Sequence, residues 1–460
     1  MTDFTNLLER TFPDIIATGD AIAPKFTHDW AGLPPVRPLA LARPRSTAEV
    51  SDLLRLCNEQ GVPVVPMGGL TGISGGAHPR ADAVALSLDR MNAIEEVDVA
   101  MGTLSAGAGV VLETAQAAAT AHGLMLGIDI GARGSCMLGG VLATNAGGNQ
   151  VIRYGMAKDH VLGVEAVLAD GTILSSMNKM LKNNAGLDLK QLFIGTEGLL
   201  GVITRVVLRL QPRPAFTATA LVGCAGSAEV IALLAATRRR IGPMLTSFEV
   251  MWPSFFDVMS RGANLPSPLA GRHGAYVIIE ASGFDAASPR AAMEECLEAA
   301  LETGLVEDAV LANSAREERG LWAVRESVSE YGTILGALTP FDVGLPLDRM
   351  AEAVTALEAA IAARWPDARA LSYGHIGDSN LHLVVNIPST LQQPTREVKA
   401  LVYDIVRDLG GTVSAEHGIG AIKRDYLSYS RTEAEIATMR LIKSALDPKG
   451  ILNPGKGFAA

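Results

Sequence analysis

A strand-like run that breaks directly into a glycine-rich loop constrains this chain more than any other feature. Residues 62–77 read VPVVPMGGLTGISGGA, in which a β-branched run fit for a buried strand is followed by five glycines and two hydroxyl side chains. Side chains this small leave backbone N–H groups open to an anion, which favours a pyrophosphate cradle. Taken alone, the segment is equally compatible with a glycine-rich surface loop.

A second glycine-rich segment and the residues before the first one strengthen the cradle interpretation. Residues 127–148 read GIDIGARGSCMLGGVLATNAGG, and this glycine density requires close backbone approach. Ser46 and Glu49 have capping-box spacing and predict a helix that ends at Gly61 and leads into the strand. The first loop then lies at the carboxyl end of a strand in an α/β unit, where ligands commonly bind. Together the two segments favour a large phosphate-bearing cofactor.

Length, charge and cysteine usage bound the class of protein. A chain of 460 residues exceeds one hydrophobic core, and a net charge of -10 argues against a nucleic-acid partner. The four cysteines are widely spaced, which excludes an iron–sulfur cluster of the usual closely spaced kind. The N-terminus lacks the charge and apolar pattern of a signal peptide, and no apolar run reaches the ~18 residues of a spanning helix. We therefore expect a cytoplasmic protein without a transmembrane segment.

The order of apolar patterns predicts an α+β protein with three regions. Pro212 and Pro214 mark a boundary, beyond which strand patterns and alanine-rich helical patterns alternate as in a domain with an antiparallel sheet. We expect a first domain over 1–214, a second over 215–410, and a C-terminal segment over 411–460.

Two histidine-containing motifs could form a metal site. His375 and His382 flank a Gly-Asp-Ser-Asn turn in YGHIGDSNLH, so their imidazoles can converge if strands enter and leave the turn. Asp378 within the turn is either a further ligand or a turn-stabilising residue, and Glu416 and His417 follow in SAEHGIG. Two histidines and a carboxylate are a common ligand set for a divalent metal, Zn most often. An ordinary polar hairpin with a separate capping glutamate explains the same residues equally well.

Arg325, in LWAVRES, lies on a predicted helix with an apolar side. An arginine can grip a carboxylate in bidentate fashion. On composition alone, a surface arginine paired with Glu326 or Glu330 is the stronger interpretation.

Six motifs in order carry a resemblance to a known family. They are PMGGLTGISGG, SCMLGGVLATNAGG, GTEGLLGVIT, YGHIGDSNLH, SAEHGIG and LNPGKG. From about residue 35 to the end, the chain resembles the FAD-dependent D-2-hydroxyacid dehydrogenases of the vanillyl-alcohol oxidase superfamily, the group with D-lactate and D-2-hydroxyglutarate dehydrogenases. The resemblance implies a two-subdomain FAD-binding fold, an antiparallel-sheet substrate domain and a helical C-terminal segment that returns to the cofactor.

The resemblance also implies which residues hold FAD. The first loop would bind the pyrophosphate, the second segment would line the rest of the cofactor, and two residues of a later strand and one near the C-terminus would contact its remaining parts. These are Pro66, Gly68, Gly69, Leu70, Thr71, Gly72, Ser74, Gly75, Gly76, Ser135, Gly139, Gly140, Thr144, Asn145, Gly147, Gly148, Gly201, Ile203 and Asn453. Members with covalent flavin carry a histidine where this chain has Leu70, so we expect non-covalent FAD.

By the same resemblance, His375, His382 and Glu416 bind a divalent metal, with Zn expected, and His417 is the general base. The chemistry agrees, because a metal chelated by the substrate's hydroxyl and carboxylate acidifies the hydroxyl that His417 deprotonates while the C2 hydride passes to flavin N5.

Substrate choice follows from two departures. In the D-2-hydroxyglutarate branch we expect a lysine where this chain has Pro340 and an asparagine where it has Val384. Apolar residues there hold a second carboxylate less well, although Arg325 is present and Ser329 could donate one turn later. We therefore expect D-lactate or a larger aliphatic D-2-hydroxy acid, with D-2-hydroxyglutarate or D-malate as the alternative.

Two further readings stay open, a glycolate-oxidase-type FAD subunit and a non-catalytic nucleotide- or metal-binding protein. The adjacent metal set and base argue against the second. We expect an external electron acceptor such as an electron-transferring flavoprotein, a quinone or a cytochrome, and a homodimer is one open assembly.

Overall fold

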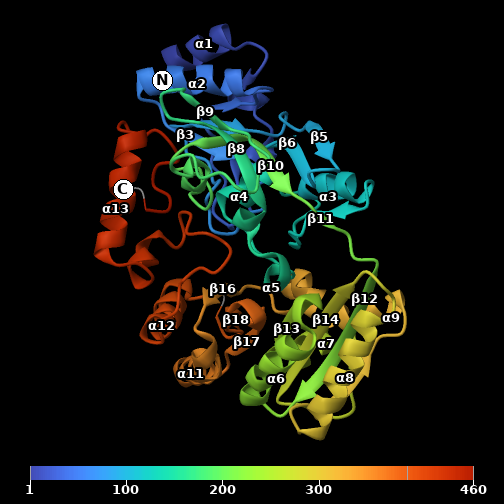
Figure 1. Ribbon diagram of the computed structural model, residues 1–460. Coiled ribbons are helices and arrows are strands. Elements are labelled where there is room, and N and C mark those ends of the chain that lie inside the picture. Colours follow the sequence, from blue (N-terminus) through green and yellow to red (C-terminus); the bar gives the residue numbers. More distant parts are fainter. Residues whose placement is uncertain (1, 391, 459–460) are drawn as a thin grey trace. The chain divides into compact units, whose positions relative to one another are not determined.

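The computed structural model of the chain describes residues 2–390 and 392–458 and divides into two compact units (Figure 1). The first unit comprises Met1–Gly148, Gly155–Arg213 and Glu416–Ala460. The second comprises Asn149–Tyr154 and Pro214–Ala415. The chain therefore leaves the first unit, forms the second, and returns at Glu416, while the short excursion at Asn149–Tyr154 has no signal in the sequence.

The first unit begins with a four-stranded sheet that carries the first glycine loop. Its strand order is β1-β2-β4-β3, with β4 parallel to both β2 and β3 and β1 antiparallel to β2. The strands are β1 (Ile16–Ala17), β2 (Ala40–Ala42), β3 (Val64–Met67) and β4 (Val84–Ser87).

Helix α2 (Thr47–Gln60) connects β2 to β3, as its end signals predict. The Ser46 side chain accepts from the Glu49 backbone N–H at 3.2 Å, and Gly61 ends the helix at φ 66°. Two strands that run in the same direction in one sheet need such a crossover, which leads the chain to β3 and the glycine loop.

A five-stranded antiparallel sheet forms the other layer of the first unit. Its order is β5-β6-β10-β8-β9. The strands are β5 (Ile94–Asp98), β6 (Thr103–Gly107), β8 (Val161–Val167), β9 (Ile173–Ser176) and β10 (Val202–Arg209).

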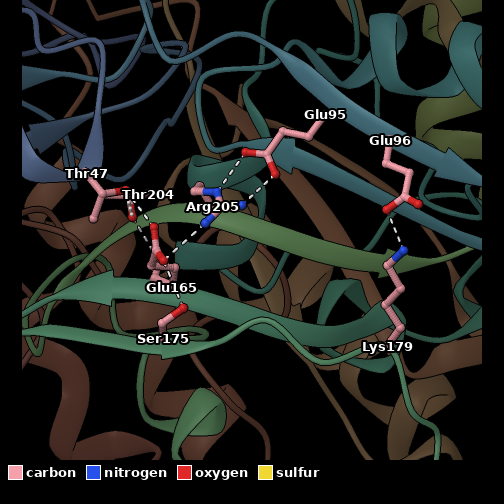
Figure 2. A network of polar contacts seen from close by, with 8 residues as sticks. All are labelled: Thr47, Glu95, Glu96, Glu165, Ser175, Lys179, Thr204 and Arg205. Carbon is pink, nitrogen blue, oxygen red and sulfur yellow. Dashed lines mark hydrogen bonds and ion pairs between the residues drawn. The ribbon is translucent and has the colours of Figure 1, made fainter.

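A polar network ties helix α2 to this sheet (Figure 2). The Glu165 carboxylate accepts from Thr47 at 2.7 Å and from Ser175 at 2.8 Å. Arg205 binds Glu95 through two bonds of 2.7 Å and reaches Glu165 at 3.2 Å. Each acceptor oxygen of buried Glu165 is thereby satisfied, which such a group requires. The network fixes the start of the helix that leads to the glycine loop.

The remaining elements of the first unit are short, apart from its terminal helices. The two-stranded sheet pairs β7 (Leu124–Met125) with β11 (Gln211–Pro212). The helices are α1 (Thr2–Thr11), α3 (Leu112–Thr120), α4 (Leu138–Ala143) and α13 (Glu433–Leu446), with 3-10 turns at Gly19–Ala21, Pro24–Thr27, Ala157–His160, Leu189–Leu192 and Arg424–Tyr429.

The second unit is built on a seven-stranded antiparallel sheet in the order β15-β12-β14-β13-β17-β18-β16. The strands are β12 (Phe216–Cys224), β13 (Leu245–Met251), β14 (Ala275–Gly283), β15 (Asp308–Leu311), β16 (Thr339–Gly344), β17 (Arg369–Gly374) and β18 (Asn380–Asn386). An antiparallel sheet was expected here, and the fold class is confirmed.

Helices α7 and α9 cover one face of this sheet. Their apolar side chains form a core with strand residues such as Met251, Tyr373 and Val384. The helices of the second unit are α5 (Val151–Tyr154), α6 (Ser227–Arg240), α7 (Pro253–Gly262), α8 (Ser288–Glu302), α9 (Ala315–Glu326), α10 (Tyr331–Ile334), α11 (Met350–Arg364) and α12 (Thr395–Asp408), with 3-10 turns at Gly242–Met244, Ser327–Glu330, Leu347–Arg349 and Ile376–Asp378. Within the described ranges, no helix has the length and apolar character needed to cross a membrane.

Candidate active site

The two glycine-rich segments of the first unit pack directly on one another. A Cβ at Gly69 would lie 2.2 Å from the Ser135 carbonyl oxygen, and one at Gly68 would lie 3.4 Å from the Gly140 Cα. At Gly148 a Cβ would lie 1.9 Å from the Asp129 carbonyl oxygen. Glycine is required for the approaches at Gly69 and Gly148, and the one at Gly69 packs the first loop directly on the backbone of the second segment.

Replacing Gly69 with alanine is expected to remove bound flavin. The added methyl group collides with backbone at Ser135, and overpacking of this kind costs about 1–3 kcal/mol and displaces the loop. The measurement is the flavin content of purified protein by absorbance. Gly131→Ala is the matched control, because a Cβ at exposed Gly131 meets nothing within 4 Å. Equal flavin content in both variants would contradict the expectation.

Strained backbone gathers in the same place. Leu70, Asn145, Glu197 and Asn453 have φ values of 60°, 50°, 52° and 44°, a region that residues other than glycine rarely adopt. Strain of this kind persists where the surrounding structure enforces it, and it clusters at ligand sites. All four residues lie in or beside motifs expected to bind FAD.

The C-terminal segment returns to the first glycine loop. The Asn453 backbone N–H donates to the Val64 carbonyl at 2.8 Å, and its side-chain amide donates to Gly76 at 3.0 Å and to Glu197 at 2.7 Å. Among the described residues, no partner is recorded for the buried Asn453 Oδ1 or for the buried Ser74 Oγ. Buried polar atoms normally bind something, so a nucleotide cofactor fits this cradle.

Two residues that sequence reasoning missed hold this cradle together. The Glu197 carboxylate accepts from the backbone N–H groups of Ile419 at 2.8 Å and Gly420 at 2.9 Å, and burial raises the pKa of Glu197. Lys456 donates to the carbonyls of Gly75 at 2.6 Å and His78 at 2.8 Å, and burial lowers its pKa to about 8. Their only sequence signal is membership of the GTEG and NPGKG motifs.

The other residues expected to bind FAD lie in several local settings. Thr144 donates to the Gly140 carbonyl at 3.0 Å, and the Asn145 side chain accepts from the Lys158 backbone N–H at 2.9 Å. Gly201 and Ile203 are buried at the start of β10, where Ile203 belongs to the hydrophobic core. The remaining ones lie on the two glycine-rich segments, with Pro66 in β3, Thr71, Gly72, Gly75 and Gly76 after it, and Ser135, Gly139 and Gly147 on the second segment.

In the second unit, His375 and His382 lie on either side of a turn between two strands, as the sequence predicts. His375 follows β17, a 3-10 turn intervenes, and His382 lies in β18, so their ring centroids are 5.2 Å apart. Both rings are buried. His382 is the cross-strand partner of Tyr373, whose ring lies 5.0 Å from its own. The fold therefore brings the two imidazoles together.

Arg325 is buried in the second unit and pairs with Glu249 of β13. Its Nε donates to Glu249 at 3.0 Å, and its guanidinium lies 4.7 Å from the Tyr373 ring centroid. The interpretation of a surface arginine paired with Glu326 or Glu330 is therefore wrong, because α9 turns this residue toward the sheet. Glu249 was missed, since nothing in SFEVM distinguishes it from an ordinary strand residue.

Glu249 also binds His375, whose Nδ1 lies 2.6 Å from Glu249 Oε1. Burial raises the pKa of Glu249, but His375 and Arg325 more than offset this, so the pKa lies below its usual value. The Glu249 carboxylate thus lies between two groups that favour its charged form.

The other expected substrate residues lie near α9. Val384 is buried in the core beneath α9 and is the cross-strand partner of Pro340. Ser329 is exposed in the 3-10 turn that follows α9. Val384 thus shares the sheet region of His382, while Ser329 faces solvent.

Glu416 and His417 open the C-terminal part of the first unit. Glu416 Oε1 accepts from the Gly148 backbone N–H at 2.9 Å, which ties it to the second glycine-rich segment. His417 is half-buried and precedes the Ile419 and Gly420 amides that Glu197 holds. The segment that carries the expected base is thus anchored to the cofactor cradle.

Comparison with known proteins decides the family. Residues 38–176 match the FAD binding domain family, and residues 213–457 match the C-terminal domain of FAD linked oxidases. The chain is 39% identical to the D-2-hydroxyglutarate dehydrogenase, mitochondrial, of Bos taurus, over 98% of this chain and 82% of the relative. It belongs to the FAD-dependent D-2-hydroxyacid dehydrogenases. The resemblance stated from the motifs is confirmed, and the chain is an enzyme of this family with an FAD-binding domain.

Two further relatives show how wide this dehydrogenase family is. The D-2-hydroxyglutarate dehydrogenase of Xanthomonas citri pv. viticola is 36% identical, over 98% of this chain and 96% of the relative. A putative D-lactate dehydrogenase, mitochondrial, of Schizosaccharomyces pombe is 34% identical, over 96% of this chain and 85% of the relative.

Among solved structures, p-cresol methylhydroxylase with bound substrate aligns at a TM-score of 0.78 and 14% identity, over 100% of this chain and 96% of that one. This likeness supports the two-domain fold of the dehydrogenase.

The expected cytoplasmic location is wrong by these comparisons. The bovine and fission-yeast relatives are named mitochondrial. The lack of signal-peptide character in the N-terminal residues is evidence against secretion only. It does not distinguish a cytoplasmic from a mitochondrial location.

Proposed function

We propose that this dehydrogenase oxidises D-2-hydroxyglutarate, or a closely similar dicarboxylic D-2-hydroxy acid, to the 2-oxo acid. The observation that carries the proposal is the buried Arg325, which is held beside His375 on the α9 face of the sheet. A buried guanidinium recognises a carboxylate with bidentate geometry. The names of the bovine and Xanthomonas relatives support the same substrate.

D-lactate or a larger aliphatic acid is the second candidate. Buried Val384 and its cross-strand partner Pro340 are apolar where we expect polar residues in the D-2-hydroxyglutarate branch. The relatives' names favour the dicarboxylate over this reading, although one relative is named a putative D-lactate dehydrogenase.

We propose that His375, His382 and Glu416 hold a divalent metal, with Zn²⁺ as the expected ion. Nitrogen donors from two imidazoles and a carboxylate oxygen form a common set for this ion. Such a metal, when bound, supplies a Lewis acid for the α-hydroxyl and α-carboxylate of the substrate.

We propose His417 as the general base that takes the hydroxyl proton. Histidine is the side chain that most often serves as a base, and the Glu197 clamp on Ile419 and Gly420 supports a fixed position for this one. FAD supplies the hydride acceptor when bound. Leu70 supports non-covalent attachment, in which case acid precipitation leaves the flavin in solution. The electrons then pass to an external acceptor.

The test is a panel of D- and L-2-hydroxy acids with an artificial electron acceptor. We expect kcat/KM for D-2-hydroxyglutarate to exceed that for D-lactate by at least about tenfold, which corresponds to about 1.4 kcal/mol. Anaerobic addition of the D-acid will bleach the flavin, while the L-enantiomers leave it oxidised. A preference for D-lactate would favour the second candidate. Bleaching of the flavin by L-acids would contradict the proposal that the enzyme oxidises D-2-hydroxy acids.

A further inference from the structure

One buried carboxylate in the second unit serves two functional residues at once. Glu249 lies in β13 and is 1% exposed. Met251, two residues along the strand, pairs with Tyr373, which in turn pairs with His382. Side chains two residues apart on a strand share a face, so Glu249 lies on the face that carries His382 and underlies α9.

Each oxygen of this carboxylate has a different partner. Oε1 lies 2.6 Å from His375 Nδ1, and Oε2 accepts from Arg325 Nε at 3.0 Å. Arg325 Nη2 in turn lies 3.4 Å from His375 Nε2. The three side chains therefore form a closed ring of contacts, with the guanidinium supported by the Tyr373 ring.

We infer that Glu249 is a positioning residue. It fixes the orientation of the His375 ring, which offers a nitrogen to the metal, and of the Arg325 guanidinium, which offers an edge to a substrate carboxylate. This inference rests on the proposed function. Because Nδ1 is engaged by Glu249, a metal at His375 would bind through Nε2, and a carboxylate partner on Nδ1 raises the basicity of that nitrogen. With Nε of Arg325 engaged as well, the Nη2 edge lies beside that same Nε2. A substrate carboxylate that approaches the metal therefore meets this edge of Arg325.

The chemistry requires a carboxylate at this position. Two acceptor oxygens can serve two donors, whereas the amide of glutamine has one acceptor oxygen and one donor nitrogen. In Glu249→Gln, one of the two partners faces an N–H group and loses its bond. Aspartate keeps the charge, but its shorter side chain cannot reach His375 and Arg325 together.

The chain provides a matched control in Glu280. This second buried glutamate lies on β14, accepts from Thr246 at 3.2 Å, and accepts from Trp322 of α9 at 3.3 Å. Ser247 of β13 is its cross-strand partner and lies two residues before Glu249, so the two carboxylates share a sheet face. The Glu280 side chain bonds to Thr219, Thr246 and Trp322, so it anchors α9 to the sheet.

The experiment compares Glu249→Gln, Glu249→Asp and Glu280→Gln in the full-length holoprotein. Zn²⁺ affinity is measured by competition with a chelating dye, together with flavin content, thermal melting, KM and kcat. We expect both Glu249 variants to bind Zn²⁺ about 10–100-fold more weakly and to show a raised KM for the 2-hydroxy acid, with flavin retained. Glu280→Gln is expected to keep the wild-type Zn²⁺ affinity and KM.

Wild-type Zn²⁺ affinity and KM in both Glu249 variants would overturn the inference. Equal losses in Glu280→Gln would also overturn it, because they would show that general anchoring of α9 is responsible. Failure of the wild-type enzyme on the substrate panel would instead reject the proposed function, since the Zn²⁺ measurement needs no substrate.

Discussion

Replacing His417 with alanine is expected to lower the rate of flavin reduction by roughly 10²–10⁴-fold, because a positioned general base contributes about that much. The variant should keep its flavin, since no residue of the two glycine-rich segments changes. Stopped-flow absorbance under anaerobic conditions, with a saturating D-2-hydroxy acid, measures the rate of flavin bleaching directly.

His122→Ala is the control for this substitution. His122 is an exposed histidine just after α3 in the same unit, so its loss should leave flavin reduction unchanged. Wild-type bleaching by His417→Ala would show that another group takes the hydroxyl proton.

Removal of the divalent metal is expected to lower turnover by about a thousandfold while the protein stays yellow. A Lewis acid at the reacting oxygen is worth several kcal/mol, and about 4 kcal/mol corresponds to this factor. The flavin should remain, because the residues expected to hold it, Asn453 and the glycine-rich segments, lie outside the histidine hairpin. Metal content by mass spectrometry and turnover with an artificial acceptor are measured after chelator treatment.

Two controls accompany the metal experiment. Chelator saturated beforehand with Zn²⁺ should leave turnover unchanged, and added Zn²⁺ should restore the stripped enzyme. His382→Ala should reproduce the loss without a chelator. Undiminished turnover in protein with verified metal loss would reject the metal site.

Local patterns predicted the parts of the fold that local interactions decide. The capping residues Ser46 and Gly61 delimit α2 as expected, and the turn between His375 and His382 forms between two strands. The density of glycines predicted the close packing at Gly69 and Gly148, because a residue without a Cβ allows another backbone segment to approach closely. The six ordered motifs then indicated FAD as the cofactor, because they resemble those of an FAD-dependent family.

Arg325 shows where such reasoning ends. Its neighbours in sequence, Glu326 and Glu330, suggested surface ion pairs, yet its partner is Glu249, 76 residues away. A helical pattern gives the apolar side of α9 but not which strand that side meets. His375 is bound by the same Glu249 carboxylate, 126 residues away in the sequence, and no local pattern predicts that pairing either.

The sequence by itself predicted the cofactor and the family, since the motifs that carry the resemblance are local stretches of the chain. Only the tertiary structure decided which carboxylates serve the site. Glu249 carries no local signal, and Glu197 has only its place in the GTEG motif. Each bonds to partners that lie far away in the sequence. The ordered motifs therefore predicted FAD through the family resemblance, while the groups that orient the chemistry are brought together by the packing of distant segments.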